Sequence, residues 1–273
     1  MFNEAMTRAV THFYDSHPIN EDQILLALRQ KGIDLANLNQ DGLTPLDQDH
    51  YGGVAANTSL AGKAGIKESD RVLDVCSGMG GPARWLAHRI GCHVTGLELT
   101  ESRCQAATRL TAMVRLDGKV AFYCGNALAM PFADETFDVA MSQEAFVHVP
   151  EKPRLIQECA RVIKSGGRIA FTDIVQRGRL TDPESARLRD EMAYPSVETT
   201  AGYRKLLQDC GFDEVQTEDL SEEWTRILVD RLAMYRSLHT TTVAKFGEAS
   251  EHGIARTVSL SACIQARSSV VPV

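Results

Sequence analysis

The sequence lacks the features of several protein classes. No run of about 18 or more apolar residues occurs, so a membrane-spanning helix is not expected. The seven cysteines are odd in number and form no Cys-x-x-Cys pair, which argues against a disulfide framework and against a zinc site. No long basic block occurs, and 29 Lys and Arg stand against 36 Asp and Glu. The resulting net charge of −7 disfavours a nucleic-acid partner. We expect a soluble cytoplasmic protein without a metal site.

The composition is that of an ordinary globular chain, with 44% hydrophobic and 24% charged residues over 273 positions. Residues 3–16 are predicted to form a helix, and the capping residues from Asn20 predict a second helix that ends at Lys31. Residues 39–57 are rich in Asp, Gly and Asn and are predicted to form a loop. Residues 1–60 are therefore interpreted as an N-terminal helical cover.

From Arg71 onward, short apolar runs alternate with helical patterns. The predicted strands are residues 71–76, 92–98, 120–124, 137–142 and 168–175, with helices between them. This alternation predicts a mainly parallel sheet with helices on both faces. In such folds, ligands bind beyond the carboxyl ends of the strands.

The last third of the chain carries weaker signals. A polar, proline-containing insertion at 178–199 is followed by a predicted helix at 201–210 and a predicted strand at 213–220. Residues 224–246 form a long amphipathic stretch whose apolar stripe indicates a core or lid face. We interpret the insertion near 178–200 as a lid.

A glycine-rich loop follows the first predicted strand. Gly78 and Gly80 allow a sharp strand-to-helix turn and a close approach of the backbone to a ligand. The run from Gly78 to Ala83 also fits the dinucleotide fingerprint GxGxxA, with Glu98 twenty residues after Gly78. On this pattern alone, NAD remains an alternative.

Asp74, four residues before Gly78, distinguishes the two cofactors. A carboxylate at this loop repels a pyrophosphate but attracts a cofactor that carries an ammonium and a sulfonium, as S-adenosylmethionine does. Glu98 is suited to accept hydrogen bonds from the ribose diol of that cofactor. Asn126, in the loop after the third strand, can bind the adenine edge. Residues 142–148 end the fourth strand, where the transferable methyl should point.

These motifs resemble those of the class I S-adenosylmethionine-dependent methyltransferases. VLDVCSGMGGPARWLA, VTGLELT, GNALAMPF, FDVAMSQEAFVHV and ARVIKSGGRIAFTDI follow the family's motif order over residues 71–175. DQDHYGG (47–53) and LAMYR (232–236) are similar to segments of sarcosine/dimethylglycine N-methyltransferases; phosphobase, tocopherol and sterol methyltransferases are more distant. The resemblance implies an α/β Rossmann-like fold with a mainly parallel seven-stranded sheet. Residues 61–273 would form the methyltransferase domain, which contains the inserted lid, and residues 1–60 would form the N-terminal cover.

The resemblance also implies the residues of the cofactor site. Asp74, Gly78 and Gly80 would line the methionyl part, Glu98 would bind the ribose, and Gln143 would contact the methionine backbone. Asn126 stands where most members have Asp, and its amide can both accept from and donate to adenine. The full implied set is Tyr51, Asp74, Gly78, Gly80, Glu98, Leu99, Arg103, Asn126, Ala127, Leu128 and Gln143.

Methyl transfer from a sulfonium mainly requires alignment and exclusion of water, so a dedicated base is not obligatory. Glu144, His148 and His50 are the candidates that assist an amine acceptor in losing a proton or that orient the substrate.

Three functions remain open. The first, which the resemblance favours, is N-methylation of an amine such as sarcosine or dimethylglycine. The second is C- or O-methylation of a quinone, a phenol or another secondary metabolite. The third is a cofactor-binding protein without catalysis, or an NAD-dependent oxidoreductase. An anionic acceptor needs a cationic anchor, whereas a prenylated ring needs a large apolar mouth; the candidate anchors are Arg84, Arg177, Arg179, Arg187 and Arg204. Besides a small-molecule substrate, a second copy of the chain is a possible partner.

Overall fold

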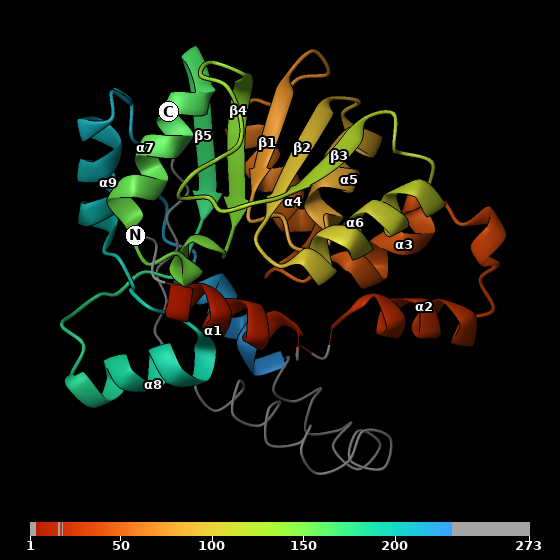
Figure 1. Cartoon of the computed structure of the whole chain (residues 1–273), viewed down its shortest axis with the longest axis horizontal. Helices are drawn as coiled ribbons and strands as arrows, with labels where there is room; N and C mark the ends of the chain where they lie inside the picture. Colours follow the sequence, from red (N-terminus) through yellow and green to blue (C-terminus); the bar gives the residue numbers. More distant parts are fainter. Residues whose placement is uncertain (1–3, 16, 18, 231–273) are drawn as a thin grey trace.

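The structure is a computed structural model that describes residues 4–15, 17 and 19–230. Five parallel strands form one sheet in the order β3-β2-β1-β4-β5 (Figure 1). They are β1 Arg71–Val75, β2 His93–Glu98, β3 Val120–Cys124, β4 Phe137–Gln143 and β5 Ile163–Thr172. The predicted alternation of strands and helices and the parallel sheet are thus confirmed.

Helices cover both faces of this sheet. Within the described residues the labelled helices of the chain are α1 Glu4–Asp15, α2 Glu21–Gln30, α3 Gln40–Asp47, α4 Gly53–Lys63, α5 Gly81–Arg89, α6 Glu101–Met113, α7 Lys152–Val162, α8 Asp182–Met192 and α9 Thr200–Asp209, with two short 3-10 helices, η1 Leu35–Asn37 and η2 Phe146–His148. Residues 221–230 are also helical. Figure 1 shows α4 and α5 behind the sheet, α7 and α9 side by side beyond β5, and α1 below the sheet.

Alternation along the central strand divides the core in two. Leu73 and Val75 of β1 belong to a buried cluster with residues of α7 and α9. Val72, which precedes Leu73 and points to the opposite face, packs with residues of α4 and α5 in a second buried cluster. Because successive side chains of a strand point to opposite faces, one short apolar run serves both layers.

The N-terminal segment confirms two predicted helices and corrects one predicted loop. Helices α1 and α2 form as expected, and the Asn20 side chain accepts from the backbone N–H of Gln23. Residues 39–57 were predicted as a loop, but they contain α3 and the start of α4. The prediction was wrong because Asn39 is a helix cap, whose side chain accepts from the N–H of Gly42, and because Leu43 is fully buried.

The last third of the described chain differs from the expectation at 213–220, where no strand forms. Phe212 and Val215 are the buried residues of that stretch, and a spacing of three does not fit a strand. The Val215 carbonyl oxygen, which a neighbouring strand would need, accepts from the Arg204 guanidinium instead. The described residues form five parallel strands, and the other two strands of the predicted seven-stranded sheet are not found among them.

Three further boundaries follow from the same part of the chain. The polar insertion contains α8, which starts with a capping box between Thr181 and Glu184. α7 ends at Val162, and β5 starts at once, five residues before the predicted strand. Residues 221–230 of the amphipathic stretch are helical, and the rest, including 232–236, lies outside the described residues.

We expect Gly96→Ala to destabilise the protein, because an added Cβ on this buried β2 residue would lie 2.4 Å from the Phe122 ring and 2.6 Å from the Ser77 hydroxyl. Overpacking of this kind costs about 1–3 kcal/mol in free energy of unfolding. The measurement is urea denaturation. Gly62→Ala in α4 is the matched control: it meets nothing within 4 Å and should gain about 0.5–1 kcal/mol. Equal effects of the two changes would contradict the close packing of β2 against Phe122.

Candidate active site

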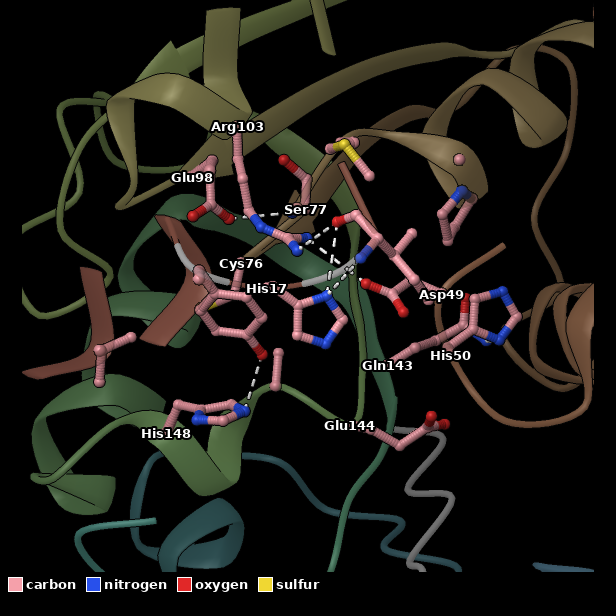
Figure 2. A pocket seen from close by; sticks show the side chains of 18 of the residues that line it. His17, Asp49, His50, Cys76, Ser77, Glu98, Arg103, Gln143, Glu144 and His148 are labelled. Atoms are coloured by element: carbon pink, nitrogen blue, oxygen red, sulfur yellow. Dashed lines mark hydrogen bonds and ion pairs between the residues drawn. The ribbon is translucent and has the colours of Figure 1, made fainter. Parts of the chain in front are cut away.

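A cavity of about 260 Å³ lies at the carboxyl ends of the strands. The loop after β1, the ends of β2 and β4, α1 and the segment 47–51 supply most of its lining, and further lining residues come from the loop after β5, the end of α8 and residues 221–230. Figure 2 shows Glu98, Arg103, Gln143, Glu144 and His148 around this space. The predicted residues that line it are His50, Tyr51, Asp74, Gly78, Glu98, Leu99, Arg103, Gln143, Glu144 and His148.

The glycine loop and the end of β2 are joined by hydrogen bonds. The N–H of Gly78 donates to Oε2 of Glu98 at 2.9 Å, and the N–H of Thr100 donates to Oε1 at 2.8 Å. Gly80 adopts φ +75°, and an added Cβ would lie 2.2 Å from the Phe122 ring, so only glycine fits there. Each carboxylate oxygen of Glu98 keeps a further lone pair for a hydroxyl donor.

Asp74 is a buried carboxylate whose Oδ2 has no hydrogen-bond partner among the described residues. Burial, and then the nearby charge of Glu98, raise the pKa of Asp74 to about 7. An unsatisfied buried acceptor costs about 1–3 kcal/mol. A cationic donor on a bound ligand would remove that cost, so the site fits the ammonium of a methionyl group and does not fit a pyrophosphate.

Arg103 attaches the N-terminal segment to the site. Its guanidinium carbon lies 4.4 Å from the centre of the Tyr14 ring, which is a cation–π contact. It also donates to the Ile19 carbonyl at 3.1 Å and pairs with Asp49 at 3.5 Å. Asp49 was not singled out from the sequence, although it lies within the DQDHYGG segment that was quoted.

The predicted adenine-binding residues line a second, smaller cavity of about 50 Å³. Asn126, Ala127 and Leu128 form its wall, and Cys76 and Leu99 line both cavities. Oδ1 of Asn126 accepts from the N–H of Leu128 at 2.9 Å, so the loop holds the side chain in place. The amide NH₂ group of Asn126 then remains as the donor toward a ligand.

Two non-glycine residues adopt a positive φ at the strand ends beside the cavity. Cys76 after β1 has φ 61° and Glu144 after β4 has φ 53°. Backbone strain of this kind costs about 1–3 kcal/mol per residue and concentrates at binding sites. The sequence carried no signal for either residue's conformation.

The end of β4 is held to the segment after α3. Oε2 of Glu144 accepts from the N–H of Tyr51, and its Oε1 accepts from the Thr172 hydroxyl at 3.0 Å. The amide nitrogen of Gln143 lies 3.2 Å from Nδ1 of His50. The Tyr51 ring contacts Trp224 edge to face, with the ring centroids 4.9 Å apart. All three predicted catalytic candidates therefore border one cavity.

His148 has both ring nitrogens in hydrogen bonds. Nδ1 lies 3.0 Å from the Ala193 carbonyl oxygen, so Nδ1 carries the proton and donates. Nε2 then accepts from the Tyr14 hydroxyl at 2.8 Å. Burial lowers the pKa of His148 to about 4, so the ring is neutral at pH 7 and is a weak base. Tyr14 and Ala193 connect it to α1 and to the end of α8.

The candidate cationic anchors do not line the cavity. Arg84 is fully buried and pairs with Asp47 at 2.9 Å, so the prediction that it anchors an acceptor was wrong. Arg204 donates to the Val215 carbonyl, and Arg177 pairs with Asp219 on the surface. Side chains that sequence reasoning missed at the cavity include Met192 and Tyr194 next to the end of α8, where periodicity gives no orientation.

Neither a metal site nor a membrane-spanning helix is found among the described residues. Among them, no group of three or more His, Cys, Asp or Glu side chains has the arrangement of a metal site. Within the same ranges, no helix has the length and apolar character needed to cross a membrane.

Comparisons with known proteins agree with this geometry. Residues 73–171 match the family described as "Methyltransferase domain". The glycine/sarcosine/dimethylglycine N-methyltransferase of Actinopolyspora halophila is 35% identical over 163 residues, which are 60% of this chain and 29% of that protein. Methyltransferase GfsG of Streptomyces halstedii is 28% identical over 224 residues, 81% of this chain and 78% of that protein. Matched proteins include enzymes named N-, C- and O-methyltransferases.

A solved structure shares the fold. Haemonchus contortus phosphoethanolamine N-methyltransferase 2, in complex with phosphomonomethylethanolamine and S-adenosylhomocysteine, superposes with a TM-score of 0.71 at 21% identity, over 81% of this chain and 52% of that one. The chain spans less than a third of the Actinopolyspora protein's length. Residues 73–171 thus match a methyltransferase domain, and the arrangement of Asp74, the glycine loop and Glu98 at the cavity fits S-adenosylmethionine as its cofactor.

Proposed function

We propose that this chain transfers a methyl group from S-adenosylmethionine to a small-molecule acceptor. The observation that carries the proposal is the buried, unsatisfied carboxylate oxygen of Asp74 beside the glycine loop. When bound, the cofactor supplies a methyl group already activated on a sulfonium. A cavity lined by Asp74, Glu98 and Glu144 favours that cation over a phosphate-bearing cofactor such as NAD.

Each part of the cofactor has residues suited to hold it. The two-acceptor carboxylate of Glu98 suits the ribose diol, flanked by Leu99 and Arg103. The wall of the smaller cavity suits adenine, with the Asn126 amide as donor and Ala127 and Leu128 as apolar contacts. Asp74, the loop at Gly78 and Gly80, Tyr51 and Gln143 remain for the methionyl end.

We infer that the acceptor is largely apolar and is methylated at a hydroxyl oxygen or a carbon, as in a phenol, a quinone or another secondary metabolite. Apolar and aromatic side chains line the cavity beyond the β4 end: Phe13, Ile174, Met192, Tyr194 and Leu228. Among the described residues of the lining, Arg103 is the one Arg or Lys, and its guanidinium already contacts Asp49 and the Ile19 carbonyl. An anionic amino-acid acceptor therefore lacks a dedicated anchor there.

N-methylation of an amine is the second candidate. The Glu144 carboxylate lies on the acceptor side and would attract an ammonium. Two relatives are named for methylation of sarcosine and dimethylglycine. Because the described lining offers no free cation for a carboxylate, the acceptor of such a reaction would be an amine without a carboxylate of its own.

The catalytic candidates act by holding the acceptor in line and excluding water. Glu144 is positioned by two donors, and His148, neutral and hydrogen-bonded at both nitrogens, is suited to orientation more than to proton removal. His50 contacts Gln143 and so lies nearer the methionyl end. We further propose that residues 1–60 close over the cavity as a cover and that the segment near 178–200 acts as a lid, because Tyr14 and Tyr194 both reach the lining.

We expect Glu98→Ala to weaken binding of S-adenosylhomocysteine by about 1–3 kcal/mol, because charged hydrogen bonds to the ribose are lost. Isothermal titration calorimetry measures the change, with exposed Glu214→Ala as the control of equal charge change. Unchanged affinity in Glu98→Ala would show that the ribose lies elsewhere.

The affinity for S-adenosylhomocysteine should also depend on pH through Asp74. Only the ionised carboxylate attracts the ligand's ammonium, and the pKa of Asp74 is raised to about 7 in the free protein. Affinity should therefore fall as the pH falls below 7, by up to about tenfold per unit. Titrations from about pH 8 to about pH 6 test this, and Asp74→Asn should remove that dependence. The same slope in both proteins would assign it to another group.

A screen with methyl-labelled cofactor tests the acceptor. Representative phenols and quinones should take up label, whereas glycine, sarcosine and dimethylglycine should not, because the described lining offers no free cation for their carboxylates. Phosphoethanolamine is included as an amine with a different anion. Transfer to the amino acids alone would overturn the assignment to an apolar acceptor, and transfer to none of a broad set would count against catalysis.

A further inference from the structure

A chain of hydrogen bonds runs from the buried Arg84 to the cavity. The Arg84 guanidinium donates to Oδ2 of Asp47 at 2.9 Å. Nε2 of Gln48 donates to Oδ1 of Asp47 at 2.6 Å, and Oε1 of Gln48 lies 3.0 Å from Nε2 of His50. Nδ1 of His50 in turn lies 3.2 Å from the amide nitrogen of Gln143. Figure 2 shows His50 and Gln143 together at the cavity wall.

The two ends of this chain fix its direction. Arg84 can only donate and an ionised Asp47 can only accept, so Gln48 must turn its NH₂ group toward Asp47. Oε1 of Gln48 is then an acceptor toward His50, which places the proton of the neutral imidazole on Nε2. Nδ1 of His50 is left as an acceptor, and it is matched by the NH₂ group of Gln143.

The result is an acceptor at the cavity wall. With its NH₂ group on His50, Gln143 leaves Oε1 buried and without a hydrogen-bond partner among the described residues. The Tyr51 carbonyl oxygen also lies 3.1 Å from Nδ1 of His50. It competes with Gln143 only when Nδ1 carries a proton, which the contact with Gln48 prevents in the neutral ring.

We propose that Gln48 is a positioning residue for the methionyl end of the cofactor. It acts by fixing the tautomer of His50, which orients the amide of Gln143 so that Oε1 accepts from the ligand's ammonium. The inference rests on the proposed use of S-adenosylmethionine. It adds a residue whose side-chain amide contacts Asp47, His50 and Asn57, three hydrogen bonds away from the cofactor.

The test compares two probes that share the adenosine thioether. S-Adenosylhomocysteine carries the ammonium and carboxylate, and 5′-methylthioadenosine carries neither. In Gln48→Met, the imidazole of His50 can carry its proton on Nδ1 and donate it to the Tyr51 carbonyl oxygen. Nδ1 then no longer accepts from Gln143, so the amide of Gln143 loses its orientation. We expect affinity for S-adenosylhomocysteine to fall by about tenfold, the equivalent of one charge-assisted hydrogen bond, with affinity for 5′-methylthioadenosine unchanged.

Asn57→Ala is the matched control. Asn57 donates to the same Oε1 of Gln48 at 2.6 Å but is no part of the chain to Gln143, so the ratio of the two affinities should stay at the wild-type value. The double variant Gln48→Met/Gln143→Met should lose no more affinity for S-adenosylhomocysteine than Gln143→Met alone. That non-additivity is not expected of a residue with a merely structural role.

Each other outcome is decisive. An equal loss for both probes in Gln48→Met, or additive losses in the double variant, would overturn the positioning role. Failure of the wild-type protein to bind S-adenosylhomocysteine would instead overturn the proposed function. If circular dichroism shows that Gln48→Met does not fold, His50→Leu takes its place, because it removes the acceptor for Gln143 and should give the same selective loss.

Discussion

The buried ion pair between Arg84 and Asp47 is the constraint on which the site depends. Both side chains are fully buried, and the guanidinium also donates to the Met79 carbonyl at 2.7 Å within the glycine loop. Removing one partner of such a pair leaves an uncompensated charge, which costs about 3–5 kcal/mol. The pair thus joins α3, in the N-terminal segment, to α5, which lies within the matched residues 73–171.

This junction determines where the residues after α3 lie. Because Asp47 is fixed against Arg84, the following residues run along the carboxyl end of the sheet. There the Tyr51 N–H reaches Glu144, and His50 reaches Gln143. Arg103 makes the corresponding junction for α1 through Tyr14. Two arginines therefore position the N-terminal segment around the cavity, and neither is available to bind an acceptor.

The charged side chains that line the cavity are mainly acidic. The lining carries more carboxylates than cations, and the pKa of Asp74 is raised because burial and Glu98 both disfavour its ionised form. A bound cationic ligand would stabilise the ionised form of Asp74, since it supplies the positive charge that this carboxylate lacks in the free protein. Around Tyr194 and Leu228 the lining is apolar, which would favour exclusion of water from a methyl transfer in this part of the cavity.

The sequence by itself determined the parallel sheet, the glycine loop and the acidic residues at Asp74 and Glu98. These depend on local periodicity and on fixed spacing within βα units, which a single chain displays directly. It did not determine the partner of Arg84, the hydrogen bonds of His148 or the irregular path of 213–220. Arg84 and Asp47 are 37 positions apart, and His148 and Ala193 are 45 apart. Only the tertiary structure decided these pairings, because a buried polar group takes whichever partner folding brings within reach, and sequence spacing carries no record of that distance.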